Sequence, residues 1–220
     1  MLRYYHYRNL SDRGRAAYKK AVAAIKAHRP YVIMERTGNP KAVLDAVKDD
    51  NPHFFFVNWY AILSRVNFRR NEIVIHINYL MERDEAIGLW QKAKELAASL
   101  SASTELGTVK RVHDYIASHT KYNPRVKVEG VFRAADHHMI GALFERVAVC
   151  EGIARAAQFL LRELRVECTY QSGFVKAEGV SGYHAWNLVS VNGRLKRMDV
   201  TWDLPQGGGP ISYKYFCTDC

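Results

Sequence analysis

The sequence lacks several features that would point to particular classes of protein. No run of about 18 apolar residues occurs in the chain, so we expect no membrane-spanning helix. Only four of the 220 residues are cysteine, which excludes a scaffold built from disulfides. Glycine-rich phosphate loops and acidic calcium loops are missing, so we expect no cofactor. No apolar leader follows Met1, which favours a cytoplasmic protein.

Positive charge is concentrated at the start of the chain. The formal net charge is +10, and residues 1–40 contain nine Lys or Arg but only two acidic residues. On a helix, Arg15, Lys19 and Lys26 would share one face beside an apolar stripe. Such a face is typical either of a solvated helix or of a patch for an acidic partner. Because no nucleic-acid-binding motif is present, we do not expect nucleic acid to be that partner.

Hydrophobic patterns predict an α+β chain in two regions. Residues 1–103 are predicted to be mostly helical, with at least one strand at 72–79 where apolar residues alternate. Residues 104–220 are predicted to hold a helix followed by an antiparallel sheet. The expected helices are 11–29, 40–48, 82–100, 108–119 and 150–164, and the later strands are 167–175, 183–191 and 195–201. The polar stretch 99–104 is the expected linker between the two regions.

The last two predicted strands form a hairpin. Asn192-Gly193 is a strong signal for a two-residue turn, which would pair Val191 with Arg194. In that register, His184 and Asp199 are diagonal neighbours on one side of the sheet, with Cα atoms roughly 7–8 Å apart. An imidazole can reach a carboxylate over that distance, and the carboxylate would then fix its tautomer.

Cys150 opens a predicted helix, where unpaired backbone N–H groups and the helix dipole favour a thiolate. Gly152 in the first turn costs about 1 kcal/mol of helix propensity relative to alanine, and it leaves room for a close backbone approach. Cys150, His184 and Asp199 are therefore a nucleophile, a base and an orienting group in suitable local settings. The sequence alone does not bring the helix start to the hairpin.

Three motifs in this order resemble the bacterial transglutaminase-like superfamily. They are Cys150-Glu151-Gly152-Ile153-Ala154, His184-Ala185-Trp186-Asn187 and Asp199-Val200-Thr201-Trp202-Asp203. Residues 138–143 resemble the segment that precedes the nucleophile in these proteins, and 113–116 with Tyr122 resemble their preceding helix and its exit. The resemblance covers about residues 108–216. It implies a papain-like core with the nucleophile at a helix N-terminus packed against an antiparallel sheet.

The resemblance also implies a reaction. Cys150 would attack an amide or ester carbonyl of a protein or peptide substrate to form a thioester, with His184 as base and acid and Asp199 as orienting carboxylate. Water would then complete hydrolysis, whereas an amine would complete transamidation. The backbone N–H of Cys150 would hold part of the oxyanion. The expected neighbours of the site are His138, Gly152, Trp186 and Trp202.

Some residues depart from the family pattern or stay outside it. Residues 146–149 stand where many relatives have glycine before the nucleophile, so the substrate class does not carry over. The alternative function is a non-catalytic module that keeps the fold and binds peptides or a polymer. Cys168 is expected in the core, and the lone pair Cys217 and Cys220 is expected to be an exposed terminus and not a metal site. No pattern indicates the oligomeric state.

Overall fold

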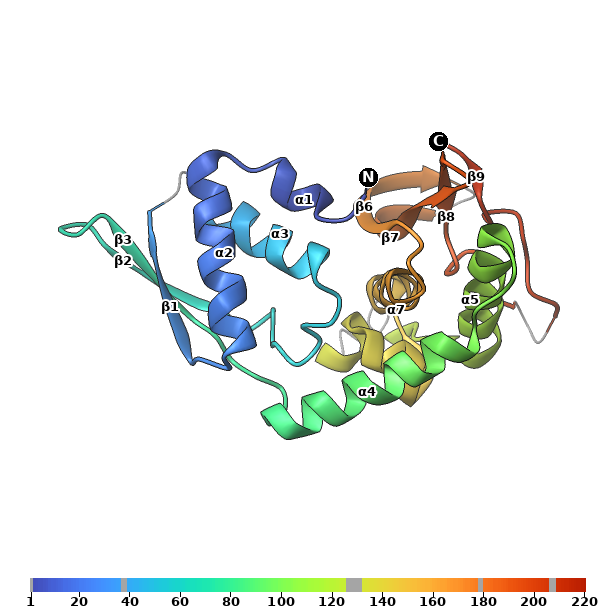
Figure 1. Cartoon of the computed structure of the whole chain (residues 1–220), viewed down its shortest axis with the longest axis horizontal. Helices are drawn as coiled ribbons and strands as arrows, with labels where there is room; N and C mark the ends of the chain where they lie inside the picture. The colour runs from blue at the N-terminus through green and yellow to red at the C-terminus, as the bar shows by residue number, and fades with distance from the viewer. Residues whose placement is uncertain (1, 37–38, 126–131, 178–179, 206–208) are drawn as a thin grey trace. The chain divides into compact units, whose positions relative to one another are not determined.

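The computed structural model describes residues 2–36, 39–125, 132–177, 180–205 and 209–220. These residues form two compact units (Figure 1). The N-terminal unit comprises residues 4–89, and the core unit comprises residues 90–220 together with Leu2 and Arg3. The division falls inside α4 (Arg83–Ser99), earlier than the polar stretch 99–104 that we expected to separate the regions. Because α4 is continuous across the division, no linker-like stretch of sequence stands at that point.

The N-terminal unit packs helices against a small antiparallel sheet. Its elements are α1 (Tyr5–Arg8), α2 (Asp12–Lys26), β1 (Tyr31–Glu35), α3 (Pro40–Asp50), β2 (Leu63–Asn67) and β3 (Glu72–His76). The strand order is β1-β3-β2, so the unit has three strands where the sequence indicated only one with confidence. β2 is exposed at every residue and therefore carries no alternating apolar pattern. The buried residues of β3 are Ile73 and Ile75, as its alternation predicted.

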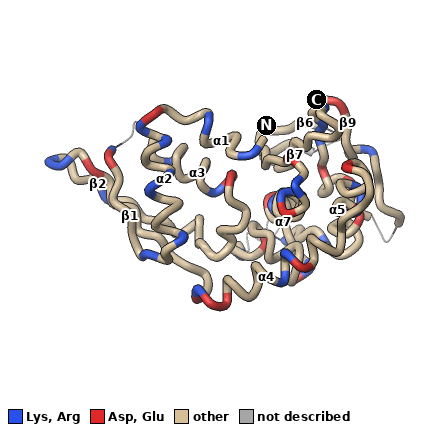
Figure 2. The backbone as a smooth tube through the Cα atoms, in the orientation of Figure 1, with Lys and Arg blue, Asp and Glu red and all other residues tan. Residues whose placement is uncertain are grey.

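Basic residues recur along α2 (Figure 2), and buried residues alternate with them along the helix. Ser11 caps the helix by accepting a hydrogen bond from the backbone N–H of Gly14 at 3.2 Å. Tyr18 and Ile25 are buried in the core of the unit, whereas Lys19 is exposed. The basic residues are therefore spaced as the exposed face of an amphipathic helix requires, and no acidic partner is needed to account for their spacing.

The core unit places one buried helix against a four-stranded antiparallel sheet (Figure 1). Its elements after α4 are α5 (Glu105–His119), β4 (Lys121–Tyr122), η1 (Ala134–His137), η2 (Gly141–Glu145), β5 (Val147–Ala148), α7 (Cys150–Glu163), β6 (Cys168–Ala177), β7 (Val180–Val191), β8 (Arg194–Met198) and β9 (Thr218–Asp219). The strand order is β6-β7-β8-β9. The predicted α+β fold, with a helix packed on an antiparallel sheet, is confirmed. No helix in the described part of the chain combines the length and apolar composition needed to cross a bilayer.

The hairpin register is the predicted one. β7 and β8 pair Val191 with Arg194 and continue to Asn187 opposite Met198. Asn192 and Gly193 both have positive φ, 50° and 75°, as a turn of type I′ requires. β8 ends at Met198 and not at residue 201, because the N–H of Asp199 donates to the carbonyl of Tyr215 at 3.1 Å and the chain turns there.

Candidate active site

Cys150 is the first residue of α7, at the end where the helix dipole is positive. The N-cap residue is Val149, whose isopropyl side chain cannot accept a hydrogen bond from the first-turn N–H groups. The Cys150 side chain is half-buried and packs against a small buried cluster formed by Ala154, Tyr170 and Ala185. The structure therefore holds a partly accessible thiol at a helix N-terminus.

Gly152 lets the backbone of another segment approach the first turn of α7. A Cβ atom at this position would lie 2.3 Å from the carbonyl oxygen of Asp136 and 2.9 Å from that of His138. The Asp136 carbonyl also accepts a hydrogen bond from the N–H of Val149 at 3.0 Å. The close backbone approach expected at Gly152 is thus observed, and it braces the helix start beside Cys150.

Replacing Gly152 by alanine should lower stability by about 1–3 kcal/mol, because two carbonyl groups of the backbone would have to move. For a chain of this size, each kcal/mol lowers the melting temperature by about 2–4 °C. Calorimetry of the two proteins would measure the change. Gly88, in α4, is the matched control because a Cβ there meets nothing within 4 Å. Its replacement by alanine should stabilise the helix slightly, and an equal response at both positions would contradict the steric argument.

His184 and Asp199 form a buried hydrogen-bonded pair. Nε2 of His184 donates to Oδ2 of Asp199 at 2.6 Å. The other carboxylate oxygen of Asp199 accepts the backbone N–H of Trp202 at 3.2 Å. Both oxygens are therefore held by groups on one turn and one strand, and the carboxylate has a fixed orientation toward the imidazole.

The surroundings of His184 favour the charged imidazolium. Burial alone would lower the pKa of His184, but hydrogen bonds and charge from Asp199 and Cys150 outweigh it and raise the pKa to about 9. Because Nε2 faces Asp199, Nδ1 is the ring nitrogen that remains for the thiol. The structure thus brings Cys150, His184 and Asp199 together in the order thiol, imidazole, carboxylate.

Two tryptophan rings lie nearly parallel to the imidazole of His184. The ring of Trp202 is 4.5 Å away between centroids and inclined by 10°, and that of Trp186 is 6.3 Å away and inclined by 23°. A Cβ on Gly173, opposite His184 in the sheet, would lie 3.3 Å from the Trp186 ring. These contacts hold the orientation of the imidazole.

His138 and Tyr122 are the remaining neighbours of the helix start. His138 is buried, and its backbone lies against the first turn of α7. Tyr122 was not singled out as a site residue, yet burial and the nearby charge of Cys150 raise the pKa of its phenol to about 12. It reaches this position because β4 pairs in parallel with β5, with Tyr122 opposite Ala148. A single aromatic residue after a helix gives no periodic signal that could have revealed this.

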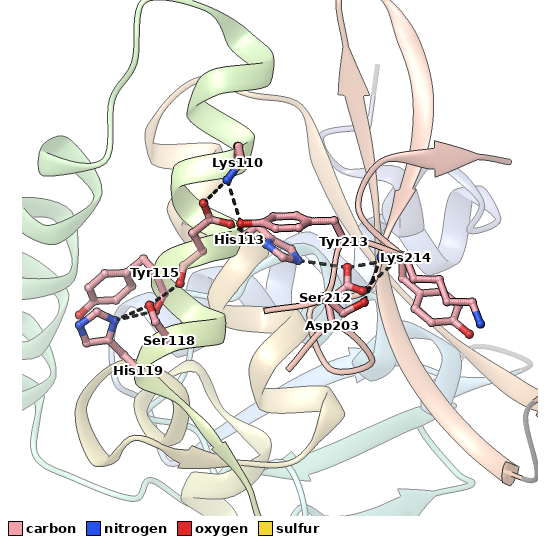
Figure 3. A network of polar contacts seen from close by, with 11 residues as sticks. Lys110, His113, Tyr115, Ser118, His119, Asp203, Ser212, Tyr213 and Lys214 are labelled. Atoms are coloured by element: carbon pink, nitrogen blue, oxygen red, sulfur yellow. Dashed lines mark hydrogen bonds and ion pairs between the residues drawn. The ribbon is translucent and has the colours of Figure 1, made fainter. Parts of the chain in front are cut away.

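A polar network ties α5 to the turn that carries Asp199 (Figure 3). Nε2 of His113 and Oδ2 of Asp203 lie 3.2 Å apart, and both side chains are fully buried. Asp203 also accepts the backbone N–H of Tyr215 at 3.0 Å. The carbonyl of Tyr215 in turn accepts the N–H of Asp199. The pair of His113 and Asp203, which the sequence analysis did not predict, therefore braces the backbone on which Asp199 stands.

The other cysteines differ from Cys150 in their surroundings. Cys168 is fully buried, and burial raises the pKa of its thiol to about 12. Cys217 is half-buried, not exposed as expected, because β9 pairs with β8 and draws the tail onto the sheet. Burial raises the pKa of its thiol to about 11. Within the described ranges, no group of three or more His, Cys, Asp or Glu side chains could hold a metal ion.

One family model matches part of the chain. The family model described as the transglutaminase-like superfamily matches residues 94–200. No curated protein matches the chain.

Similar solved structures include a TGase, with 16% identity and a TM-score of 0.47 over 84% of this chain and 54% of the other. A candidate cysteine protease from Cytophaga hutchinsonii has 16% identity and a TM-score of 0.41 over 67% of this chain and 63% of the other. A candidate protease from Parabacteroides distasonis has 12% identity and a TM-score of 0.34 over 62% and 35% of the two chains. The present chain thus spans about half the length of the matched TGase chain.

Proposed function

We propose that the protein is a cysteine-dependent acyl-transfer enzyme with Cys150 as its nucleophile, in keeping with the match of residues 94–200 to the family model of the transglutaminase-like superfamily. The observation that carries this proposal is the imidazole of His184, which is hydrogen-bonded to Asp199 at 2.6 Å and lies close enough to Cys150 for the thiol to help raise the pKa of His184. Thiol, imidazole and carboxylate in this order are the groups that nucleophilic catalysis by cysteine requires.

In the first half of the proposed reaction, the sulfur of Cys150 forms a bond to the carbonyl carbon of an amide or ester. The bond from that carbon to the leaving nitrogen or oxygen breaks, and the imidazolium of His184 gives its proton to the leaving group. The product is a thioester on Cys150. The backbone N–H of Cys150, at the start of α7, supports the transient oxyanion together with the helix dipole.

In the second half, neutral His184 takes a proton from water or from an amine as that molecule attacks the thioester. The carbon–sulfur bond breaks, the acyl group leaves as an acid or as a new amide, and the thiolate–imidazolium pair is restored. Asp199 keeps the imidazole oriented through both halves. We propose a protein or peptide as the acyl donor, because amides are the groups that this chemistry cleaves or exchanges.

The test is the rate at which iodoacetamide alkylates each cysteine between pH 5 and pH 9, measured by peptide mass spectrometry. We expect Cys150 to react fastest well below pH 8 and to lose this advantage in His184→Ala. Cys168 and Cys217 are internal controls, because their raised pKa values of about 12 and 11 keep them as thiols. p-Nitrophenyl acetate should then release a burst of p-nitrophenol and leave an acetyl group on Cys150.

The exposed Cys220 provides the reference for an ordinary thiol. If Cys150 is alkylated no faster than Cys220 in the folded protein, and no acetyl group appears on it, the enzyme proposal fails. A binding module that retains the fold would then be the better account, because a binder has no need of a reactive thiol.

A further inference from the structure

The strand order β1-β3-β2 places β1 at one edge of the sheet in the N-terminal unit (Figure 1). Two hydrogen bonds just beyond its ends set the phase of its ladder with β3. The carbonyl of Pro30 accepts the N–H of Ile77 at 2.8 Å, and the N–H of Arg36 donates to the carbonyl of Asn71 at 2.9 Å. In an antiparallel ladder, such bonded pairs recur at every second residue. The even-numbered residues of β1 therefore bond to β3, and the odd-numbered residues point their backbone groups away from it.

The free edge of β1 consists of the backbone N–H and C=O groups of Tyr31, Ile33 and Glu35. Among the described residues, no backbone group of another segment pairs with them. Many proteins blunt such an edge with proline, lysine or a bulge, because a row of unpaired groups is a template for another strand. β1 contains neither proline nor lysine, and its register with β3 is continuous. The edge is therefore open to pairing by another extended chain.

A groove of about 580 Å³, a size typical of binding clefts, lies beside this strand. Its walls come from α2, from β1 and from the two residues just before β1. Within the described part of the chain, no residue of β3, β2 or α3 lines it. The groove therefore opens at the free edge of β1 and not over the face of the sheet. Ala23 and Ala24 form part of the helical wall, and their small side chains leave room beside the strand.

The charged residues that line the groove are both cations, Lys20 and Arg29. Both are exposed, and neither side chain forms an ion pair with a described residue. The acidic residue of β1, Glu35, lies outside the lining. The groove thus presents two uncompensated positive charges next to a free strand edge, which is complementary to an acidic chain.

The two faces of the sheet differ at this edge. Side chains alternate along β1, so Val32 and Met34 point into the core that the strand shares with α2. Tyr31 and Ile33 point to the opposite face, where they are 50% and 45% exposed. A strand added at this edge would place every second side chain on the side of α2, where the cations are. The side chains between them would lie beside exposed apolar groups.

We propose that the free edge of β1 binds an extended segment of a partner protein as an added strand, and that acidic and apolar residues alternate in this segment. Its backbone pairs with the free edge, its acidic side chains face Lys20 and Arg29, and its apolar side chains lie beside Tyr31 and Ile33. The proposal rests on the groove and the free edge, not on the spacing of basic residues along α2. It does not depend on the proposed function.

The first experiment measures, by fluorescence anisotropy, how the full chain binds a fluorescein-labelled octapeptide that alternates glutamate and valine. In Ile33→Pro the affinity should fall by about three- to tenfold, because proline removes an N–H at the free edge. Val66→Pro is the matched control on the other edge of the sheet, where Val66 also points its N–H away from β3, and it should leave the affinity unchanged. Neither substitution breaks a ladder bond, so both variants should fold, which thermal unfolding would verify.

The second experiment tests the charges without altering the strand. Lys20→Glu, Arg29→Glu should weaken binding of the alternating peptide by about tenfold. Arg13→Glu, Lys26→Glu makes the same change in net charge at exposed positions of α2 outside the groove, and it should have little effect. A peptide with the four glutamates before the four valines has the same composition but no alternation, and it should bind more weakly to the natural chain.

Three results would overturn the proposal. Equal binding of the alternating and the block peptides would mean that net charge alone attracts them. Unchanged affinity in Ile33→Pro would exclude pairing at the free edge. A concentration-dependent dimer that Ile33→Pro abolishes, with no peptide bound to the natural chain, would mean that a second copy occupies the edge. None of these measurements involves Cys150, so they are independent of whether the proposed function holds.

Discussion

Replacing Asp199 by asparagine should slow acylation of Cys150 by about 10²–10⁴-fold near neutral pH, in line with the same change in other catalytic triads. The charge of Asp199 helps to raise the pKa of His184 to about 9 against the opposing effect of burial. An amide has no such charge, so the pKa of His184 should fall and the imidazolium should become scarce at neutral pH. The rate of acetylation by p-nitrophenyl acetate, followed by mass spectrometry, would measure the loss.

The same variant should change how stability depends on pH. The folded-state pKa of His184 is raised from 6.5 to about 9, so the pair with Asp199 stabilises the fold fully below pH 6.5 and loses this contribution as the pH rises through about 9. The stability difference between the natural chain and Asp199→Asn should therefore be largest near pH 6 and shrink toward pH 9, as measured by urea unfolding.

Asp219→Asn is the matched control for both measurements. Asp219 is an exposed carboxylate on β9 of the same sheet and pairs with Lys196 at 2.6 Å. Surface pairs of this kind contribute little to stability, so acylation should be unchanged. Comparable acylation rates in the Asp199 and Asp219 variants would show that the buried carboxylate has no orienting role.

The relation between His184 and Asp199 could be predicted because it is a local property of the chain. Asn192 and Gly193 specify a two-residue turn, and side-chain alternation then determines which residues share a side of the sheet. The hydrogen bond between the two side chains follows from that register. The position of Cys150 was predicted only as a helix start, because packing of α7 against β7 depends on tertiary contacts between segments far apart in sequence.

Tyr122 and the pair of His113 and Asp203 could not be found in this way. Tyr122 approaches the thiol through a two-residue parallel pairing of β4 with β5, too short to leave a pattern in the sequence. His113 and Asp203 are 90 residues apart and meet only when α5 packs beside the turn after β8. Neither contact leaves a periodic pattern or a turn motif in the sequence, and these are the signals from which a single sequence can be interpreted.

Replacing Asp203 by alanine should be the most destabilising single change in this network. Asp203 accepts a hydrogen bond from the buried imidazole of His113 at 3.2 Å and from the backbone N–H of Tyr215 at 3.0 Å. Each buried group left without its partner costs about 1–3 kcal/mol, so the free energy of unfolding should fall by about 2–6 kcal/mol. Urea unfolding would measure this loss.

Lys110→Ala is the control at the exposed edge of the same network, where the ammonium of Lys110 donates to the hydroxyl of Tyr213. This substitution should lower the free energy of unfolding by at most about 1 kcal/mol.

The variant should also weaken the candidate site while the chain is still folded. The backbone N–H of Tyr215 donates to the carboxylate of Asp203, and the carbonyl of Tyr215 accepts the N–H of Asp199. Trp202, stacked on His184 at 4.5 Å, stands on the same turn. If the turn loosens, Asp199 and Trp202 both lose their fixed positions beside the imidazole, so alkylation of Cys150 should slow at temperatures well below unfolding. Destabilisation without any change in that rate would mean that the turn is held by β8 and β9 alone, and that the network of His113 supports the fold but not the geometry of the site.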